Sequence, residues 1–125
     1  AVALHGPPTV IEGDRVLLSR ALENLLRNAA DAVRQHGGGS ITVTLRDEPL
    51  PSVTIADTGV GFNPADGPRF FLPFQSNKPN GFGMGLPLAK KIVLLHGGTL
   101  RLTGEVGKGA VATIEFGEQA SAAGV

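Results

Sequence analysis

The hydrophobic positions of the chain alternate between helical and strand spacing, with one long irregular stretch between. The first regular stretch runs from Arg15 to His36, and its apolar residues recur about one helical turn apart: Leu18, Leu22, Leu25, Ala29 and Ala32/Val33. Asp14 stands in front as a suitable N-cap, and Gly37–Gly39 follow as a helix-ending run. This pattern predicts a long amphipathic helix.

Strand-like alternation follows in two pairs of segments. "SITVTLRD" (40–47) places Ile41, Val43 and Leu45 on one face, and "SVTIAD" (52–57) follows a proline-flanked turn. Near the end, "GGTLRLTG" (97–104) and "GAVATIEF" (109–116) have the same alternation. The glycine-rich "GEVGKGA" between them resembles a P-loop fragment but lacks the Ser/Thr after the lysine, so it is interpreted as a hairpin turn.

A second helix is expected from Leu86 to Leu95, with Pro87 tolerated in its first turn. Between Thr58 and about Phe82 no periodicity survives, and five of the six phenylalanines lie there. A long segment of this kind is usually either a functional lid or disordered. The order of helix, two strands, lid, helix and two strands predicts a sheet with helices on one face.

Composition narrows the class of protein without indicating an activity. The chain has 125 residues, which favours a single domain (1–125) with a core at about 8–117 and a flexible tail at 118–125. Eleven basic and eleven acidic residues cancel, so nucleic acid and direct membrane contact are disfavoured. Cysteine is absent and no apolar run reaches about 18–20 residues. We therefore expect a cytoplasmic domain. It could be a part of a larger protein, and that protein could be membrane-bound.

Three polar residues share one face of the first predicted helix. Asn24, Asn28 and Asp31 stand at i, i+4 and i+7. One interpretation is a solvated stripe, although Arg20, Arg27 and Arg34 already supply an exposed flank. The other is a set of oxygen ligands for a hard cation such as Mg²⁺.

Asp57 has the same strand parity as Val53 and Ile55, so its carboxylate should point to the buried side of the sheet. A buried carboxylate needs a partner, and the exocyclic amine of a nucleobase would serve. Gly59 and Gly61 would then let a flat ring approach the backbone. The alternative is an ordinary turn, for which "DTG" is also suited.

Gly81, Gly83 and Gly85 lead into the second helix, whose N-terminus favours phosphate. Lys78 could add a positive charge. A hinge or a loose turn is the alternative.

Taken in order, "NLLRNAADA", "DTGVGF", "FFLPFQSNKPNG" and "GFGMGL…HGG" resemble the N, G1, F and G2 boxes of histidine kinase catalytic domains, within the gyrase/Hsp90/histidine kinase/MutL ATPase superfamily. The resemblance covers roughly Val10 to Phe116, and "SNKPNG" is most similar to nitrogen-regulation-type sensor kinases. It implies an α/β (α+β) two-layer sandwich, the Bergerat ATP-binding fold, with a mixed, mostly antiparallel sheet covered on one face by helices.

The resemblance also implies roles for individual residues. Asn28 would bind Mg²⁺ and Asn24 would line the same site, while Asp57 would read the adenine amino group beside Gly59 and Gly61. Lys78 would lie near the phosphates, so Asn24, Asn28 and Lys78 are the implied catalytic residues. Phe71 and Phe74 match the F box. The complete implied ATP-binding set is Asn24, Asn28, Asp31, Asp57, Gly59, Gly61, Phe74, Lys78, Gly81, Phe82, Gly83, Met84, Gly85 and Leu86.

Some positions depart from the family pattern. Asp31 stands where many histidine kinases carry a lysine, which changes the expected phosphate contacts. Phe82 and Met84 stand where Thr or Ser and Leu are commoner, and Ala110 replaces a frequent threonine. A non-catalytic nucleotide-sensing or interaction module therefore remains an alternative.

The chemistry expected is phosphoryl transfer to histidine. ATP-hydrolysing relatives carry a glutamate where this chain has Asn24, and Glu23 is rotated by about 100° from that position. This disfavours a second alternative, an ATPase or serine kinase of the same superfamily. His5, His36 and His96 are interpreted as structural, so the phosphoacceptor histidine should lie on a dimerisation domain absent from this chain. The expected partners are that domain and a downstream response regulator, and the isolated domain should be a monomer.

Overall fold

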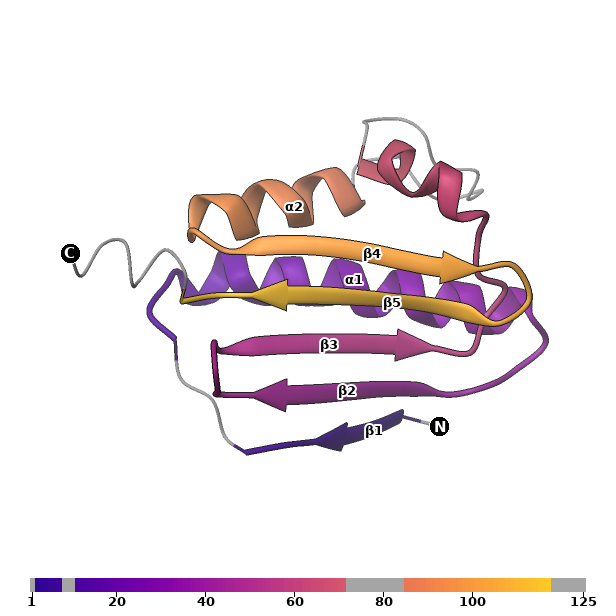
Figure 1. Cartoon of the computed structure of the whole chain (residues 1–125), viewed down its shortest axis with the longest axis horizontal. Helices are drawn as coiled ribbons and strands as arrows, with labels where there is room; N and C mark the ends of the chain where they lie inside the picture. The colour runs from indigo at the N-terminus through magenta and orange to yellow at the C-terminus, as the bar shows by residue number, and fades with distance from the viewer. Residues whose placement is uncertain (1, 8–10, 72–84, 118–125) are drawn as a thin grey trace.

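The computed structural model describes residues 2–7, 11–71 and 85–117, and contains one mixed sheet and three helices in that part of the chain. The strands are β1 (Val2–His5), β2 (Ile41–Arg46), β3 (Ser52–Asp57), β4 (Thr99–Glu105) and β5 (Gly109–Glu115). The helices are α1 (Arg15–Gln35), the 3₁₀ helix η1 (Pro64–Phe71) and α2 (Gly85–Leu95). The strand order is β1-β2-β3-β5-β4, and only the β1–β2 pair is parallel (Figure 1).

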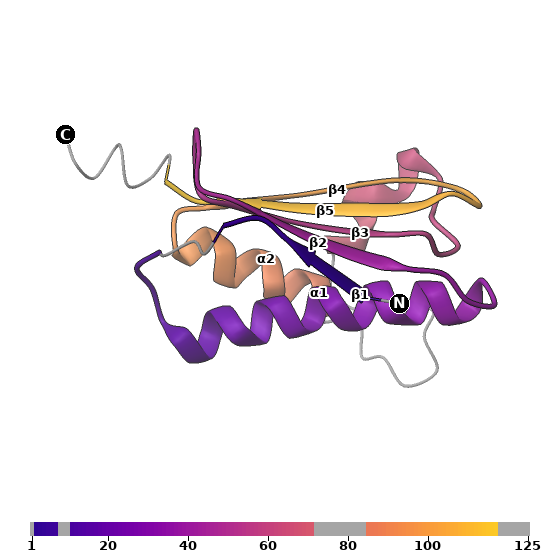
Figure 2. The same cartoon turned by 90° about the horizontal axis from the view of Figure 1, so that it is seen from below.

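The molecule has two layers, with α1 and α2 side by side on one face of the sheet (Figure 2). This confirms the predicted α+β sandwich with a mixed, mostly antiparallel sheet. The predicted hairpin at "GEVGKGA" is also confirmed, because β4 and β5 pair from Glu105 and Gly109 onward.

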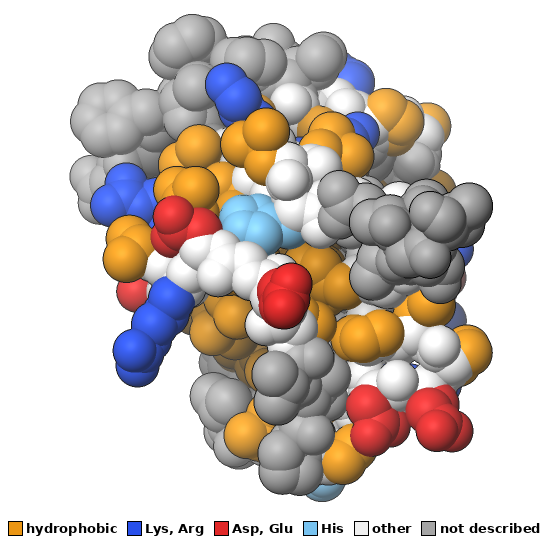
Figure 3. Space-filling model, turned by 90° about the vertical axis from the view of Figure 1, so that its left-hand side faces the viewer, with side chains coloured by type: hydrophobic (Ala, Val, Ile, Leu, Met, Phe, Trp, Pro, Cys, Tyr) orange, Lys and Arg blue, Asp and Glu red, His pale blue; other side chains and the backbone are white. Residues whose placement is uncertain are grey.

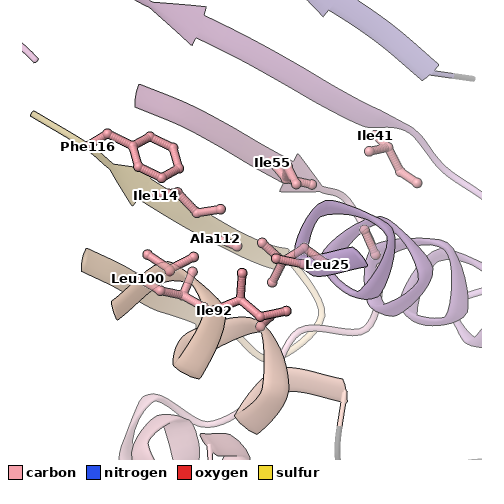
Figure 4. Close-up of a cluster of buried hydrophobic side chains, with 12 residues drawn as sticks. Leu25, Ile41, Ile55, Ile92, Leu100, Ala112, Ile114 and Phe116 are labelled. Carbon is pink, nitrogen blue, oxygen red and sulfur yellow. The ribbon is translucent and has the colours of Figure 1, made fainter. Parts of the chain in front are cut away.

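The core fills the space between the helices and the sheet (Figure 4). Leu25 on α1 and Ile92 on α2 face the sheet residues Ile55 and Ile114, all of them at most 3% exposed. The full buried set is Ala21, Leu25, Ala29, Ile41, Ile55, Ala89, Ile92, Val93, Leu100, Ala112, Ile114 and Phe116. Burying one large aliphatic side chain contributes about 1.5–3 kcal/mol, so this cluster is the main stabilising feature of the two-layer packing.

Helix α1 begins and ends as the sequence predicts. The Asp14 carboxylate accepts a hydrogen bond from the Leu17 N–H at 3.0 Å, and His36 is the C-cap. His96, at the end of α2, connects the two helices: its Nδ1 lies 2.8 Å from the Ile92 carbonyl oxygen, and its Nε2 accepts from the Asp14 N–H at 2.9 Å. These bonds support the structural interpretation of His96.

Two elements were not predicted. β1 was missed because "VALH" is short and is followed at once by Gly6 and Pro7. The prediction that nothing regular lies between Thr58 and Phe82 is wrong for η1, a 3₁₀ helix with Gly67 and Pro68 inside, which lacks the 3.6-residue period.

Exposed aliphatic side chains gather at the end of the molecule where α1 begins and α2 ends. Val16, Leu94 and Leu95 are each more than half exposed there, and Figure 3, which views this end, shows hydrophobic side chains among charged ones. In the described ranges, no helix combines the length and the hydropathy that crossing a membrane requires.

Candidate functional site

The candidate residues meet at the opposite end of the sheet. β3 ends there with Asp57, α1 passes with its second half, and α2 begins (Figure 1). The end of β3, the second half of α1 and the start of α2 therefore lie at the same end of the molecule (Figure 1).

The Asp57 carboxylate lies on the helix-facing side of the sheet, as predicted, because it alternates with the buried Ile55. Its Oδ1 accepts a hydrogen bond from the Gly59 N–H at 2.8 Å. Burial raises the pKa of the Asp57 carboxyl above its ordinary value, although hydrogen bonds from the backbone of Gly59 and Ala110 counteract part of that effect. The local Asx-type turn is therefore present, but one backbone turn does not require a carboxylate that is removed from water.

Small residues and one aromatic ring adjoin Asp57. The strand register places Asp57 opposite Ala110, and Ala110 opposite Gly104, in one row across the sheet. The Phe62 ring covers Gly104 so closely that a Cβ there would lie 2.5 Å from it, and its centroid is 4.9 Å from that of Phe70. The Asp57 carboxylate and the Phe62 ring over Gly104 thus lie on either side of Ala110, whose methyl group is the only side chain between them in this row.

Phe62 was not among the predicted site residues. Its position directly after "DTGVG" could have indicated that it lies near Asp57. The sequence alone, however, shows only a phenylalanine in an irregular segment, and does not show what its ring contacts. The structure also locates Ala110, which replaces a threonine that is frequent in the family. Ala110 pairs with Asp57 across β3 and β5, so a methyl group lies where a polar side chain would have been next to the carboxylate.

The α1 stripe is half-buried. Asn24, Asn28 and Asp31 are all partly shielded, whereas Arg20 and Arg27 on the same helix are exposed. The Asn24 Nδ2 atom is buried and has no hydrogen-bond partner within the described residues. A buried amide donor without an acceptor is costly, so this position favours a ligand that brings acceptor oxygens.

Asp31 interacts with a neighbour on the same helix. Its carboxylate forms an ion pair with Arg34, which lies one turn further on, and Asp31 is 15% exposed against 76% for Arg34. The negative charge at the position where a lysine is common is therefore offset in part by an arginine.

Gly59 and Gly61 have a different packing role from the one expected. A Cβ on Gly59 would lie 2.5–2.7 Å from the Ala32 backbone and methyl group, and one on Gly61 would lie 1.9 Å from the Glu105 carbonyl oxygen. Gly61 also has a φ of +65°, which favours glycine. Both glycines are explained by close approach of the chain to itself, and contact with a nucleobase is not needed to account for them.

The predicted glycine-rich segment falls mostly outside the described residues. Outside the described residues lie the whole "SNKPNG" segment (76–81), the 118–125 tail and the site residues Phe74, Lys78, Gly81, Phe82, Gly83 and Met84. Gly85 begins α2, and a Cβ added to it would meet no atom of the described residues within 4 Å, while Leu86 packs against the core cluster. Phe71, at the end of η1, also packs on the core and has the Lys90 ammonium 4.7 Å from its ring centroid.

The residues fit a magnesium nucleotide better than a bare metal ion. Among the described side chains, no group of three or more His, Cys, Asp or Glu could hold a metal. Mg²⁺ commonly takes one or two protein oxygens and completes its shell with phosphate and water, which matches a stripe of two asparagines and one aspartate.

Comparisons with known proteins agree with this geometry. The family model described as "Histidine kinase-, DNA gyrase B-, and HSP90-like ATPase" matches residues 13–120. The chain is 35% identical over 117 residues to the C4-dicarboxylate transport sensor protein DctS of Rhodobacter capsulatus, covering 91% of this chain and 18% of that protein. It is 33% identical over 104 residues to the sensor histidine kinase ZraS of Escherichia coli (strain K12), covering 83% and 22%. The chain thus spans about a fifth of the length of these relatives.

Solved structures give the same result. The mycobacterial sensor histidine kinase MprB matches with a TM-score of 0.75 at 29% identity, over 92% of this chain and 80% of that one. Full-length ShkA, solved in complex with AMPPNP, matches with a TM-score of 0.74 at 30% identity, over 93% of this chain and 24% of ShkA. The fold is that of histidine kinase catalytic domains.

Proposed function

Because the chain belongs to the histidine kinase-, DNA gyrase B- and HSP90-like ATPase family, we propose that it is the ATP-binding catalytic domain of a two-component sensor histidine kinase. In this proposal it donates the γ-phosphoryl group of ATP to a histidine on a separate dimerisation domain. The observation that carries the proposal is the half-buried Asp57 carboxylate at the end of β3, next to the α1 helix that presents Asn24, Asn28 and Asp31. The AMPPNP complex of the similar ShkA supports nucleotide binding at this fold.

The adenine would bind at the sheet. Asp57 would accept a hydrogen bond from the exocyclic amine, which would compensate the burial that raises its pKa. The Phe62 ring, which already lies over Gly104, would offer an edge to a planar base above Ala110, whose methyl group leaves room beside the Asp57 carboxylate.

The triphosphate and Mg²⁺ would lie along α1. Asn28 would supply an oxygen to the metal, and the Nδ2 of Asn24, which has no hydrogen-bond partner among the described residues, would donate to a phosphate oxygen. The N-terminus of α2 at Gly85 would add N–H donors and a favourable dipole. Lys78, Phe74, Gly81, Phe82, Gly83, Met84 and Leu86 complete the proposed set, and Arg34 would limit the repulsion between Asp31 and the phosphates.

Transfer to histidine is favoured over hydrolysis by the side chains on α1. Asn24 occupies the position where a water-activating carboxylate would be needed, and Glu23 is exposed on another side of the helix. In the transfer, a neutral imidazole nitrogen forms the new bond to phosphorus while the bond to the ADP oxygen breaks. The chain's contribution would be to position the nucleotide and to stabilise its charge.

The acceptor histidine would lie on another domain. In the described part of the chain, both ring nitrogens of His96 are engaged, His36 caps α1, and His5 lies on the edge strand β1. The proposed partners are therefore a dimerisation domain of the parent protein and a downstream response regulator. The isolated domain would be a monomer, and the parent protein would be a cytoplasmic or a membrane-bound kinase. Its assignment to the nitrogen-regulation type of sensor kinase stays a prediction.

A reconstituted transfer reaction tests the function. The chain is mixed with a histidine-bearing dimerisation domain taken from a similar sensor kinase, together with Mg²⁺ and γ-labelled ATP. Acid-labile label on the dimerisation domain is expected, and its His→Gln variant should remain unlabelled. Release of inorganic phosphate without label on the histidine would instead favour hydrolysis, and nucleotide binding without either reaction would favour a sensing module.

A further inference from the structure

Thr58, directly after Asp57, joins the end of β3 to the turn between α1 and β2. Its N–H donates to the Ser40 carbonyl oxygen at 3.0 Å, and the Ser40 N–H donates to Thr58 Oγ1 at 2.9 Å. These two bonds span 18 residues of sequence. They attach the backbone of the Asp57 strand end to the segment that leaves the α1 helix.

The next residues continue this attachment onto α1 itself. The Val60 N–H donates to the Ala32 carbonyl oxygen at 3.2 Å, which also accepts from the His36 N–H at 3.1 Å. Gly59 packs directly on the Ala32 backbone. Since Ala32 is one helical turn after Asn28, residues 58–60 connect the carboxylate of the sheet with the turn of α1 that carries the amide stripe.

The Thr58 hydroxyl fits this turn tightly. A Cβ added to Gly39 would lie 2.4 Å from Thr58 Oγ1, so the oxygen stands against the main chain. Replacing the hydroxyl with a methyl group of the same size would leave the Ser40 N–H facing carbon. Because this bond is exposed, the turn would then shift or water would replace the lost acceptor, and in either case the direct link between the two segments is lost.

We infer that Thr58 is a positioning residue that sets the span between the Asp57 carboxylate and the polar stripe of α1. Its side chain accepts from the Ser40 N–H, so it would act on a bound nucleotide through the two walls of the site. The inference rests on the proposed function, because the span matters only for a ligand that touches both walls.

A positioning role for Thr58 predicts different effects on the affinities of two ligands. Adenosine would contact only the Asp57 wall, whereas AMPPNP with Mg²⁺ would contact both the Asp57 wall and α1. A change in the span should weaken the ligand that bridges the walls and should leave the ligand held by one wall unaffected.

The experiment measures both affinities by calorimetry for the wild-type chain, Thr58→Val and Thr58→Ser. For Thr58→Val we expect a loss of roughly threefold to tenfold for AMPPNP·Mg²⁺, the range that one net hydrogen bond contributes, with adenosine binding unchanged. Thr58→Ser keeps the oxygen and should retain the wild-type ratio of the two affinities. Circular dichroism of each variant verifies folding, and Thr58→Ala replaces Thr58→Val if the latter does not fold.

The results that would overturn the inference can be distinguished from the result that would overturn the proposed function. Equal losses for adenosine and AMPPNP·Mg²⁺ in Thr58→Val, or no loss for either, would mean that Thr58 does not set the span. Failure of the wild-type chain to bind either ligand would instead overturn the proposed function, and the inference with it.

Discussion

Replacing Asp57 with asparagine should stabilise the ligand-free domain and weaken its binding of ATP. The side chain is half-buried, and burial raises the pKa of its carboxyl because the charged form loses water. Asparagine keeps an oxygen that can accept from the Gly59 N–H, so the local turn should survive. The variant removes the buried charge and also the acceptor proposed for the adenine amine.

The size of each effect follows from the chemistry of the carboxylate. A charge-assisted hydrogen bond contributes about 1.5–3 kcal/mol, so the affinity for ATP should fall roughly tenfold to hundredfold. Removal of the burial cost should raise the melting temperature of the ligand-free domain at neutral pH.

The stability gain should depend on pH in a defined direction. Because the pKa of Asp57 is raised in the folded state, the protonated form is the one that the fold favours. That stabilisation is present below the ordinary carboxyl pKa of about 4 and is lost as the pH rises through it to the folded-state value. The difference in melting temperature between variant and wild type should therefore be small near about pH 4 and largest near neutral pH.

Thermal unfolding at several pH values and calorimetry with AMPPNP provide the assay. Asp47→Asn is the matched control, since Asp47 is exposed in the turn between β2 and β3 and should change neither quantity. Equal ATP affinity in Asp57→Asn would remove the proposed adenine contact. A variant no more stable than the wild type at neutral pH would refute the burial argument.

Four further substitutions test other parts of the account. Asn28→Ala should abolish the Mg²⁺ dependence of phosphotransfer, measured by metal titration, and an unchanged dependence would reject the metal assignment. His96→Phe removes both ring hydrogen bonds and should lower the unfolding free energy, measured by urea titration, by about 1–3 kcal/mol. An unchanged unfolding free energy would show that these bonds do not stabilise the fold. Gly59→Ala should destabilise the fold by about 1–3 kcal/mol in the same assay, because its Cβ collides with the Ala32 backbone, and wild-type stability would contradict that packing. In Gly85→Ala the new Cβ meets no described atom within 4 Å, so stability should be unchanged or raised by up to about 1 kcal/mol. A loss of AMPPNP affinity in this variant would then indicate a close approach of phosphate, and an equal affinity would argue against one.

The parts of the fold that could be predicted from the sequence have strong local signals. The α1 pattern from Leu18 to Val33, its Asp14 cap and the alternation in β2 to β5 each indicate one structure. β1 could not be found in the same way, since it is held by parallel pairing with β2, from Val2 opposite Ile41 onward, across a long stretch of sequence.

The site was predictable only where side-chain type carries the chemistry. Asp57 could be placed by strand parity, and the α1 stripe by helical spacing. Phe62 and Thr58 could not, because their positions depend on contacts with Gly104 and Ser40, which are distant in sequence. For Gly59 the sequence predicted the approach of a nucleobase, which stays a prediction, and did not reveal its packing against the backbone of α1 at Ala32.

The most direct test of the central claim is a crystal structure of the chain with AMPPNP and Mg²⁺. The account predicts the adenine amine within hydrogen-bonding distance of the Asp57 carboxylate, the Phe62 ring beside the base, and Mg²⁺ bound by Asn28 and phosphate. A nucleotide bound elsewhere, or one whose base and metal contact neither Asp57 nor Asn28, would contradict it.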